Sequence, residues 1–371
     1  MVSFDFQPST RIIYGPNQIE RLGELAVELG AKRVMVVSDP GIVKAGHAGR
    51  GLDALHGAGL ETFLFQDVGE NPSTDHVAAG VAFAEQSKPD LLVGLGGGSS
   101  MDCAKGVNFI YTNGGKMQDY WGRDKALHAM LPMIAVPTTS GTGSETQSFA
   151  LISDAQTHVK MACGDKKAAC RVALLDPTLT VTQPAGVTAV TGIDALAHAL
   201  ETYVTKVRNA MSLAFSREAW RLCSENFPKI LANPKDLKAR GGMQLGACLA
   251  GLAIENSMLG ATHACANPLT AHFGIVHGQA IAVMLPHVIR FNGEQFDEWY
   301  RDLHPQGAAG LADFITQLNI TAGLKTTLTS LNIPRSSLPQ LATDAAKQWT
   351  GSFNPRPVGE TELLQLYEAA M

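Results

Sequence analysis

The chain has 371 residues, long enough for two domains of ordinary size, and 45% of them are hydrophobic. Its 29 basic and 34 acidic residues leave a formal net charge of −5. No long run of one sign occurs, which argues against a nucleic-acid groove or a polybasic membrane contact. We therefore expect a small-molecule partner.

The cysteines and the N-terminus indicate the cellular compartment of the protein. The six cysteines form no CxxC pair, and several lie in apolar stretches typical of small buried side chains. We expect free thiols in a reducing environment. The N-terminus lacks the charged-then-apolar order of a signal peptide, and no apolar run reaches membrane-spanning length. These patterns predict a cytoplasmic protein.

The first half of the chain alternates short apolar runs with amphipathic stretches, as parallel strands joined by covering helices do. The expected strands span residues 34–38, 62–65, 91–95 and 133–136, with helices such as 18–29 and 75–86 between them. The pattern predicts a doubly wound, Rossmann-like α/β domain that binds a dinucleotide over residues 1–182.

From about Pro184 onward the strand pattern fades, and Ala- and Leu-rich stretches with helical spacing follow. We expect an all-helical, metal-binding catalytic domain over residues 183–371. Breaks in its helices are expected at Pro228, Pro234, Pro268, Pro286 and Pro334.

A glycine-rich turn, GGGSSMD at residues 96–102, follows the strand expected at 91–95 and leads into an expected helix. Glycine permits close approach of the backbone, and the free amides of a helix start present donors to an anion such as a pyrophosphate. The turn is not GxGxxG, because position 99 is Ser and position 101 is Met. A tight connection without a ligand is the alternative interpretation.

A second loop, PTTSGTGSE at residues 137–145, follows the next strand and places five hydroxyl groups beside two glycines. Its alternative is a solvated turn whose hydroxyls bond to their own backbone. Two such loops after successive strands favour a shared phosphate-binding role. Asp39 also has two interpretations: its carboxylate could bind a ribose diol and repel a 2′-phosphate, which favours NAD over NADP, or it caps a helix or an Asp-Pro turn.

Four residues of the second half indicate a metal site. Asp194 and His198 lie four apart in GIDALAH at 192–198, so they project from one face of a helix and can chelate one ion. His263 and His277 add two imidazoles in small-residue surroundings. Any one histidine alone is more often a packed or surface residue. Together, three imidazoles and one carboxylate suit Fe²⁺, Zn²⁺, Co²⁺, Ni²⁺ or Mn²⁺.

With these motifs the chain resembles, nearly end to end, the iron-containing, group III alcohol dehydrogenases. That family shares its fold with glycerol dehydrogenase and dehydroquinate synthase. Besides the two loops and GIDALAH, the resemblance is carried by NPS at 71–73, SFA at 148–150, LLDP at 174–177, LPH at 285–287 and NPR at 354–356.

The resemblance implies a metal-dependent, NAD-linked oxidoreductase that interconverts a small alcohol or diol and its aldehyde or ketone by hydride transfer. A homodimer or higher homo-oligomer is also implied. The implied metal ligands are Asp194, His198, His263 and His277, with Fe²⁺ as the expected ion and Zn²⁺ as the alternative. The implied cofactor contacts are Asp39, Asn71, Gly97, Gly98, Ser99, Asp102, Thr138, Thr139, Thr142, Lys160 and Leu179, with Phe149 near the nicotinamide.

One position departs from the family's pattern. Members frequently carry a second histidine four residues after the third ligand, where this chain has Asn267, which cannot titrate. If that histidine relays the substrate proton, the relay here runs through water, the cofactor ribose or another group. His272 is one candidate, but it lies about 180° around a continuous helix from His263. This relay needs a helix break near Pro268, and a packed or surface histidine is the alternative.

Three rival functions stay open from the sequence. A dehydroquinate synthase-like lyase needs cationic side chains for phosphate and carboxylate, and residues 185–290 offer few. A metal- and nucleotide-binding sensor is a non-enzymatic alternative. Within the family, a hydroxy-acid or maleylacetate-type reductase is another. Net production or consumption of NADH separates the dehydrogenase, the lyase and the sensor.

Overall fold

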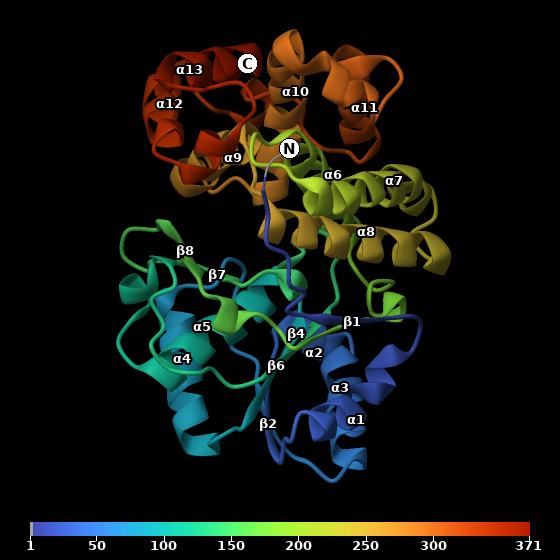
Figure 1. The fold of residues 1–371 in the computed structure, drawn as a ribbon, viewed down its shortest axis with the longest axis vertical. Coiled ribbons are helices and arrows are strands. Elements are labelled where there is room, and N and C mark those ends of the chain that lie inside the picture. The colour runs from blue at the N-terminus through green and yellow to red at the C-terminus, as the bar shows by residue number, and fades with distance from the viewer. Residues whose placement is uncertain (1–2) are drawn as a thin grey trace. The chain divides into compact units, whose positions relative to one another are not determined.

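A computed structural model describes residues 3–371 of the chain, which forms two compact units (Figure 1). The α/β unit comprises residues 7–139 and 143–183. The helical unit comprises residues 184–371, together with the short segments 3–6 and 140–142. The functional roles given to residues 1–182 and 183–371 stay predictions.

A six-stranded parallel sheet forms the centre of the α/β unit. Its strands, in spatial order, are β1 (Arg11–Tyr14), β9 (Val172–Leu175), β6 (Met133–Pro137), β4 (Leu91–Gly96), β2 (Arg33–Val37) and β3 (Glu61–Phe65). The four strands predicted from the sequence are therefore confirmed. The strands β1 and β9 were not predicted.

Alternate residues of the central strands enter two different apolar layers. In β2, Val34 and Val36 pack in the layer that includes α1 (Leu22–Glu28) and α3 (His47–Gly57). Met35 and Val37 pack in the layer that includes α4 (Thr74–Ser87) and α5 (Gly98–Asn113). Because both faces are buried, such strands are continuous apolar runs in the sequence. The doubly wound prediction is confirmed.

A second, three-stranded sheet was not predicted. It contains β5 (Gly122–Arg123), β8 (Lys160–Gly164) and β7 (Phe149–Ser153), with β7 and β8 antiparallel. Phe149 lies opposite Gly164, where any Cβ would clash with the phenyl ring. The guanidinium of Arg123 lies 4.9 Å from the centre of that ring. Two residues of this sheet, Gly164 and Arg123, therefore lie beside the Phe149 ring.

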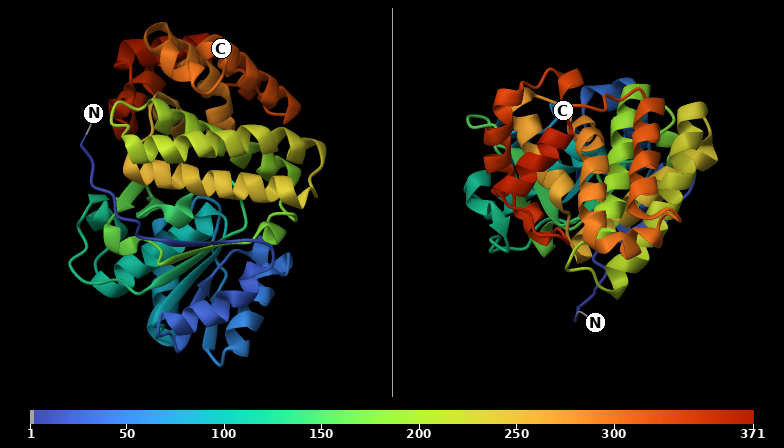
Figure 2. Two further views of the ribbon diagram at one scale, coloured as in Figure 1. Left: turned by 45° about the vertical axis from the view of Figure 1, so that its right-hand side comes forward. Right: turned by 90° about the horizontal axis from the view of Figure 1, so that it is seen from above.

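The helical unit contains no strand in residues 184–371, all of which are described, so the all-helical prediction is confirmed. Its helices surround one apolar core, and α7 and α8 lie side by side (Figure 2). The helices are α6 (Ala185–Val204), α7 (Ala210–Ala232), α8 (Leu237–Asn256), α9 (Ala261–Phe273), α10 (His277–Arg301), α11 (Gly307–Thr321), α12 (Leu338–Ala346) and α13 (Glu360–Ala369).

The predicted helix breaks at three prolines are wrong. Pro228, Pro268 and Pro286 lie inside α7, α9 and α10. A proline lacks the N–H that would bond to the carbonyl four residues earlier. In α10 that carbonyl belongs to Ala282, and the side chain of Asn319 on α11 donates to it at 2.7 Å. Packing against a neighbouring helix thus replaces the missing donor.

The six cysteines are all buried free thiols, as the sequence predicted. Within residues 3–371 no single helix is both long and apolar enough to cross a membrane, although α8 and α9 meet that test as a pair bent by 103°.

Close packing of α10 on α6 depends on Gly278, the residue after His277. A Cβ at position 278 would clash with the backbone carbonyl of Val190 in α6. We predict that Gly278→Ala lowers the free energy of unfolding by roughly 1–3 kcal/mol, the usual cost of overpacking, as measured by denaturant titration. Gly186→Ala is the matched control, because a Cβ there meets nothing within 4 Å. Equal stability of the two variants would contradict the prediction.

Candidate metal centre and nucleotide-binding loops

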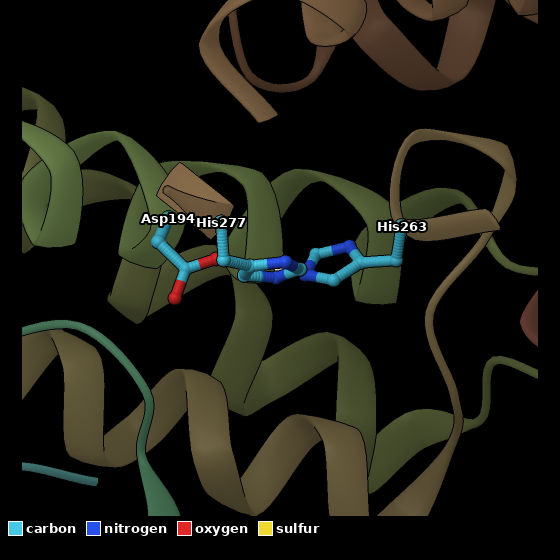
Figure 3. A group of neighbouring side chains, drawn as sticks. All are labelled: Asp194, His263 and His277. Atoms are coloured by element: carbon cyan, nitrogen blue, oxygen red, sulfur yellow. Dashed lines mark ion pairs between the residues drawn. The ribbon is translucent and has the colours of Figure 1, made fainter. Parts of the chain in front are cut away.

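The four predicted metal ligands lie in the helical unit and form one group. Helix α6 carries Asp194 and His198, α9 carries His263, and α10 begins at His277. Asp194 Oδ1 lies 3.4 Å from His198 Nε2. It also lies 3.6 Å from His263 Nε2 and 3.7 Å from His277 Nε2. Figure 3 shows Asp194, His263 and His277 pointing toward one another, and one ligand atom from each lies within 4.8 Å of the others.

Two facing atoms of this group lack hydrogen-bond partners. Asp194 Oδ1 and His263 Nε2 are both buried and unbonded among the described residues. Separations of 3.4–3.7 Å exceed ordinary hydrogen-bond lengths. Buried polar atoms without a partner are rare in folded proteins. A divalent ion among the four side chains would satisfy both atoms, so the residues present fit a metal ion.

The outer nitrogens of two imidazoles are held by hydrogen bonds. His198 Nδ1 donates to the carbonyl oxygen of Gly141 at 3.2 Å. His263 Nδ1 donates to Glu201 Oε2 at 2.5 Å. With Nδ1 protonated in each neutral ring, Nε2 presents its lone pair to Asp194, as a metal ligand must.

Glu201 was missed by the sequence analysis although a signal existed. Residues 194, 198 and 201 lie on one face of α6 at helical spacing. Glu201 is 4% exposed, and a carboxylate is rarely buried without a partner. A third polar residue on the face of two candidate ligands indicates an outer contact of the same site.

Burial and neighbouring charges shift the pKa values of the group. Burial raises the pKa of Asp194, but attraction to the imidazoles, first that of His198, outweighs it and holds that pKa below its usual range. Burial lowers the pKa of His198. Burial also acts to lower the pKa of His263, but the charge of Glu201 and contacts with both carboxylates raise it to about 9. A bound divalent ion would therefore displace a proton from His263.

The structure places His272 away from the group. Helix α9 continues through Pro268 without the break that the proton-relay hypothesis required. The His272 side chain is 46% exposed, and its Nε2 lies 2.9 Å from Asp344 Oδ2. It is therefore a surface histidine. Asn267 donates from Nδ2 to Gln348 Oε1 at 3.0 Å.

The predicted nucleotide-binding segments belong to neighbouring strands of the α/β unit. Asp39 follows β2, Gly97 follows β4 and Thr138 follows β6, and these three strands are adjacent in the order β6–β4–β2. The chain moves from β2 outward to β3 and then returns to the other side of β2 at β4. Ligands of open α/β sheets bind at the carboxyl ends of strands where the order reverses in this way.

Glycines allow the turn after β4 to lie close to its surroundings. Gly96 has φ 155°, and a Cβ there would clash with the Ser100 hydroxyl. Gly97 caps α5 without a side-chain bond, and a Cβ there would lie 3.3 Å from Thr139 Cγ2. Gly98 is the first residue of α5. The two predicted loops thus meet, beside the free amides of a helix start.

Asp39 adopts the alternative role considered for it. Its Oδ1 accepts a bond from the Ile42 amide at 3.1 Å as the cap of α2 (Pro40–Lys44). Its Oδ2 accepts a bond from Ser100 Oγ at 3.1 Å. The carboxylate therefore joins the segments after β2 and β4, while its contact with a ribose stays a prediction.

Three predicted cofactor contacts from distant parts of the sequence come together. The Asn71 amide donates to Ser99 Oγ at 3.2 Å, and Lys160 Nζ donates to Asn71 Oδ1 at 3.1 Å. Asn71 has φ 51°, the left-handed conformation that asparagine tolerates better than most residues. This cluster links the turn after β4 to strand β8.

The other predicted contacts lie in varied surroundings. Asp102 Oδ1 accepts a bond from Ser144 Oγ at 2.6 Å. Thr138 is buried, and its hydroxyl has no hydrogen-bond partner among the described residues. Leu179 packs in the apolar layer of α1 and α3. Thr142 belongs to the helical unit. The cofactor contacts of these four residues stay predictions.

Lys105 fixes the end of the hydroxyl-rich loop and was not assigned a role from the sequence. It is 0% exposed. Its Nζ donates to the carbonyl oxygens of Ser144, Gln147 and Phe149 at 2.6, 2.8 and 3.0 Å. A lysine three residues after Asp102, on a helix with no other charged side chain, was the available signal.

We predict that Lys105→Met lowers the free energy of unfolding by roughly 3 kcal/mol or more, because it removes the buried ammonium group that donates to three loop carbonyls. Denaturant titration measures this effect. Lys166→Met in the same unit removes an exposed lysine and should change stability by less than about 0.5 kcal/mol. Matching unfolding curves for the two variants would argue against this role of Lys105.

Family models match both halves of the chain. The model for iron-containing alcohol dehydrogenase matches residues 9–177. The model for the C-terminal part of the Fe-containing alcohol dehydrogenase family matches residues 188–371.

Similar proteins agree with these models over full length. A 1,3-propanediol dehydrogenase of Klebsiella pneumoniae is 33% identical over 99% of this chain and 98% of its own. An NAD-dependent methanol dehydrogenase of Bacillus methanolicus is 32% identical over the whole of both chains.

Among solved structures, a 1,3-propanediol oxidoreductase superposes with a TM-score of 0.95 at 32% identity, over all of both chains. Sulfoacetaldehyde reductase from Bifidobacterium kashiwanohense, in complex with NAD⁺, superposes with a TM-score of 0.91 at 28% identity, over 100% of this chain and 99% of its own. The predicted fold and the predicted class, an oxidoreductase acting on alcohols, are confirmed. This chain belongs to the iron-containing alcohol dehydrogenase family.

Proposed function

We propose that this protein is a metal-dependent, NAD-linked dehydrogenase that interconverts a small alcohol or diol and its aldehyde or ketone. The observation that carries the proposal is the convergence of three imidazole Nε2 atoms on Asp194 Oδ1 at 3.4–3.7 Å. Membership of the family supports the reaction class. The names of two similar proteins, a propanediol and a methanol dehydrogenase, support a short alcohol or diol as substrate.

Asp194, His198, His263 and His277 are the proposed metal ligands, with Fe²⁺ as the proposed ion and Zn²⁺ as the alternative. A divalent ion held there supplies Lewis acidity toward the alcohol or carbonyl oxygen. Asp194 provides the one negative charge among the ligands, which offsets part of the ion's charge. The bonds from Nδ1 of His198 and His263 keep those two rings turned toward the ion.

The loops after β2, β4 and β6 are the proposed NAD site. Hydride transfer is chemistry that the nicotinamide supplies, and the protein binds and orients it. The amides at the start of α5 would face the pyrophosphate, and the Asp39 carboxylate would disfavour a 2′-phosphate. The NAD⁺ complex of the similar sulfoacetaldehyde reductase supports this choice of cofactor.

A cytoplasmic location and a homodimer or higher homo-oligomer complete the proposal. The six buried free thiols are consistent with a reducing compartment. The oligomeric state is proposed from the family resemblance alone.

The decisive experiment follows NADH at 340 nm with a panel of alcohols and diols. The protein is stripped of metal and then reloaded separately with Fe²⁺ and Zn²⁺ without oxygen. We expect NADH formation only after reloading, because the ligand group alone lacks a Lewis acid. If metal and NAD both bind but no pairing yields NADH, the lyase or the sensor replaces the dehydrogenase.

Replacement of the central carboxylate should remove metal and activity together. Loss of a residue that only hydrogen-bonds to a ligand typically weakens metal binding about 10- to 100-fold. Asp194→Ala removes a ligand itself, so it should weaken metal binding by more than that. Metal content and NADH formation measure both effects. An Asp194→Ala protein that stays active and metal-loaded would refute the assignment.

His272→Gln is a histidine control for the same assays. Because His272 bonds to Asp344 at the surface, we expect this variant to retain its metal, its turnover and the pH dependence of turnover. A changed pH dependence would restore His272 as a proton relay.

A further inference from the structure

We propose that Glu201 is a positioning residue for the metal centre. It holds the His263 ring and the backbone beside that ring. This inference rests on the proposed function, since it concerns a ligand of the proposed metal. Glu201 contacts Nδ1 of His263, whereas Asp194 lies beside Nε2 of the same ring. Glu201 acts through His263.

Each carboxylate oxygen of Glu201 accepts one bond from the start of α9. Oε2 lies 2.5 Å from His263 Nδ1, and Oε1 accepts from the Thr262 amide at 2.6 Å. Glu201 and His263 are both buried, at 4% exposure each. One side chain therefore fixes both the direction of the ring and the backbone from which the ring projects.

The start of α9 is built around this contact. Its cap residue, Gly260, provides no side-chain bond. Two acceptors from other helices and loops replace it: Glu201 bonds to the Thr262 amide, and Asn354 Oδ1 accepts from the Ala261 amide at 3.2 Å. A Cβ at Gly260 would lie 2.9 Å from Asn354 Oδ1 and 3.1 Å from Glu201 Oε1. A larger residue at position 260 would therefore crowd both acceptors. A carboxylate at the positive end of a helix is also favourable.

The chemistry demands two acceptor atoms at residue 201. The Thr262 amide and His263 Nδ1 both donate, and an ionised carboxylate is the side-chain group that accepts at both oxygens. A carboxamide accepts at one atom only. In either orientation of the amide in Glu201→Gln, an NH₂ group would face another donor. The variant keeps the size of the side chain but cannot keep both bonds.

The test uses the full-length protein, stripped of metal and titrated with Zn²⁺ against a chromophoric chelator. We expect Glu201→Gln to weaken Zn²⁺ binding by about 10- to 100-fold, the usual effect of an outer partner of a ligand. In the Zn²⁺-loaded wild-type protein, ¹H–¹⁵N spectra should show a hydrogen-bonded Nδ1–H resonance for His263. Glu201→Gln at excess Zn²⁺ should lose or shift it strongly.

Asn354→Ala is the matched control. It removes the other acceptor at the same helix end without touching His263, and it also breaks bonds to Asn292. It should lower the unfolding temperature while leaving Zn²⁺ affinity and the Nδ1–H resonance unchanged. If it weakens Zn²⁺ binding as much as Glu201→Gln does, Glu201 is merely structural and the proposal is overturned.

Should Glu201→Gln fail to fold, Glu201→Asp carries the test. It keeps both acceptors with a reach shorter by one carbon, so it should retain the Nδ1–H resonance and bind Zn²⁺ less tightly than the wild type. Unchanged Zn²⁺ affinity in whichever variant folds overturns the role of Glu201 alone. A wild-type protein that binds neither Zn²⁺ nor Fe²⁺ overturns the proposed metal centre as well.

Discussion

The helical unit depends on one constraint, the burial of the Asp194 carboxylate. Its side chain is 7% exposed, and its Oδ1 has no hydrogen-bond partner among the described residues. Buried charge is costly unless it is paired, and a cation held between this carboxylate and the three imidazoles from three helices would provide the pairing. The packing that brings them in is close, as the clash expected at position 278 shows. A bound ion would therefore stabilise the fold that creates its site.

The two units present ligands by different means. At the proposed NAD site of the α/β unit, backbone amides and hydroxyl groups at the carboxyl ends of parallel strands would contact the phosphates, and glycines at 96 and 97 leave room beside them. At the proposed metal site of the helical unit, side chains from three helices would provide the ligand atoms, and Glu201 holds the direction of the His263 ring. The first site depends on backbone geometry and the second on rotamers, so different kinds of substitution would damage them.

Local patterns explain which features the sequence could predict. Strands such as β2 were predictable because burial on both faces makes them continuous apolar runs, and Asp194 with His198 were predictable because four residues make about one helical turn. Strands β1 and β9 are short. Arg11 pairs with Val172, which is far away in the sequence, and no local pattern encodes such a pair. The roles of Glu201 and Lys105 depend on tertiary partners. The helix break that the His272 relay needs is absent, because α9 continues through Pro268.

The effects of substitutions at positions 286 and 319 depend on each other, because the Asn319 amide replaces the donor that Pro286 lacks. Asn319 serves the Ala282 carbonyl because Pro286 cannot. Loss of Asn319 alone would leave that carbonyl buried and unbonded, whereas a prior change of Pro286 to alanine would restore the helix's own donor. The order of substitutions therefore matters: a variant of this chain that lacks the proline should tolerate a change at position 319 better than one that keeps it.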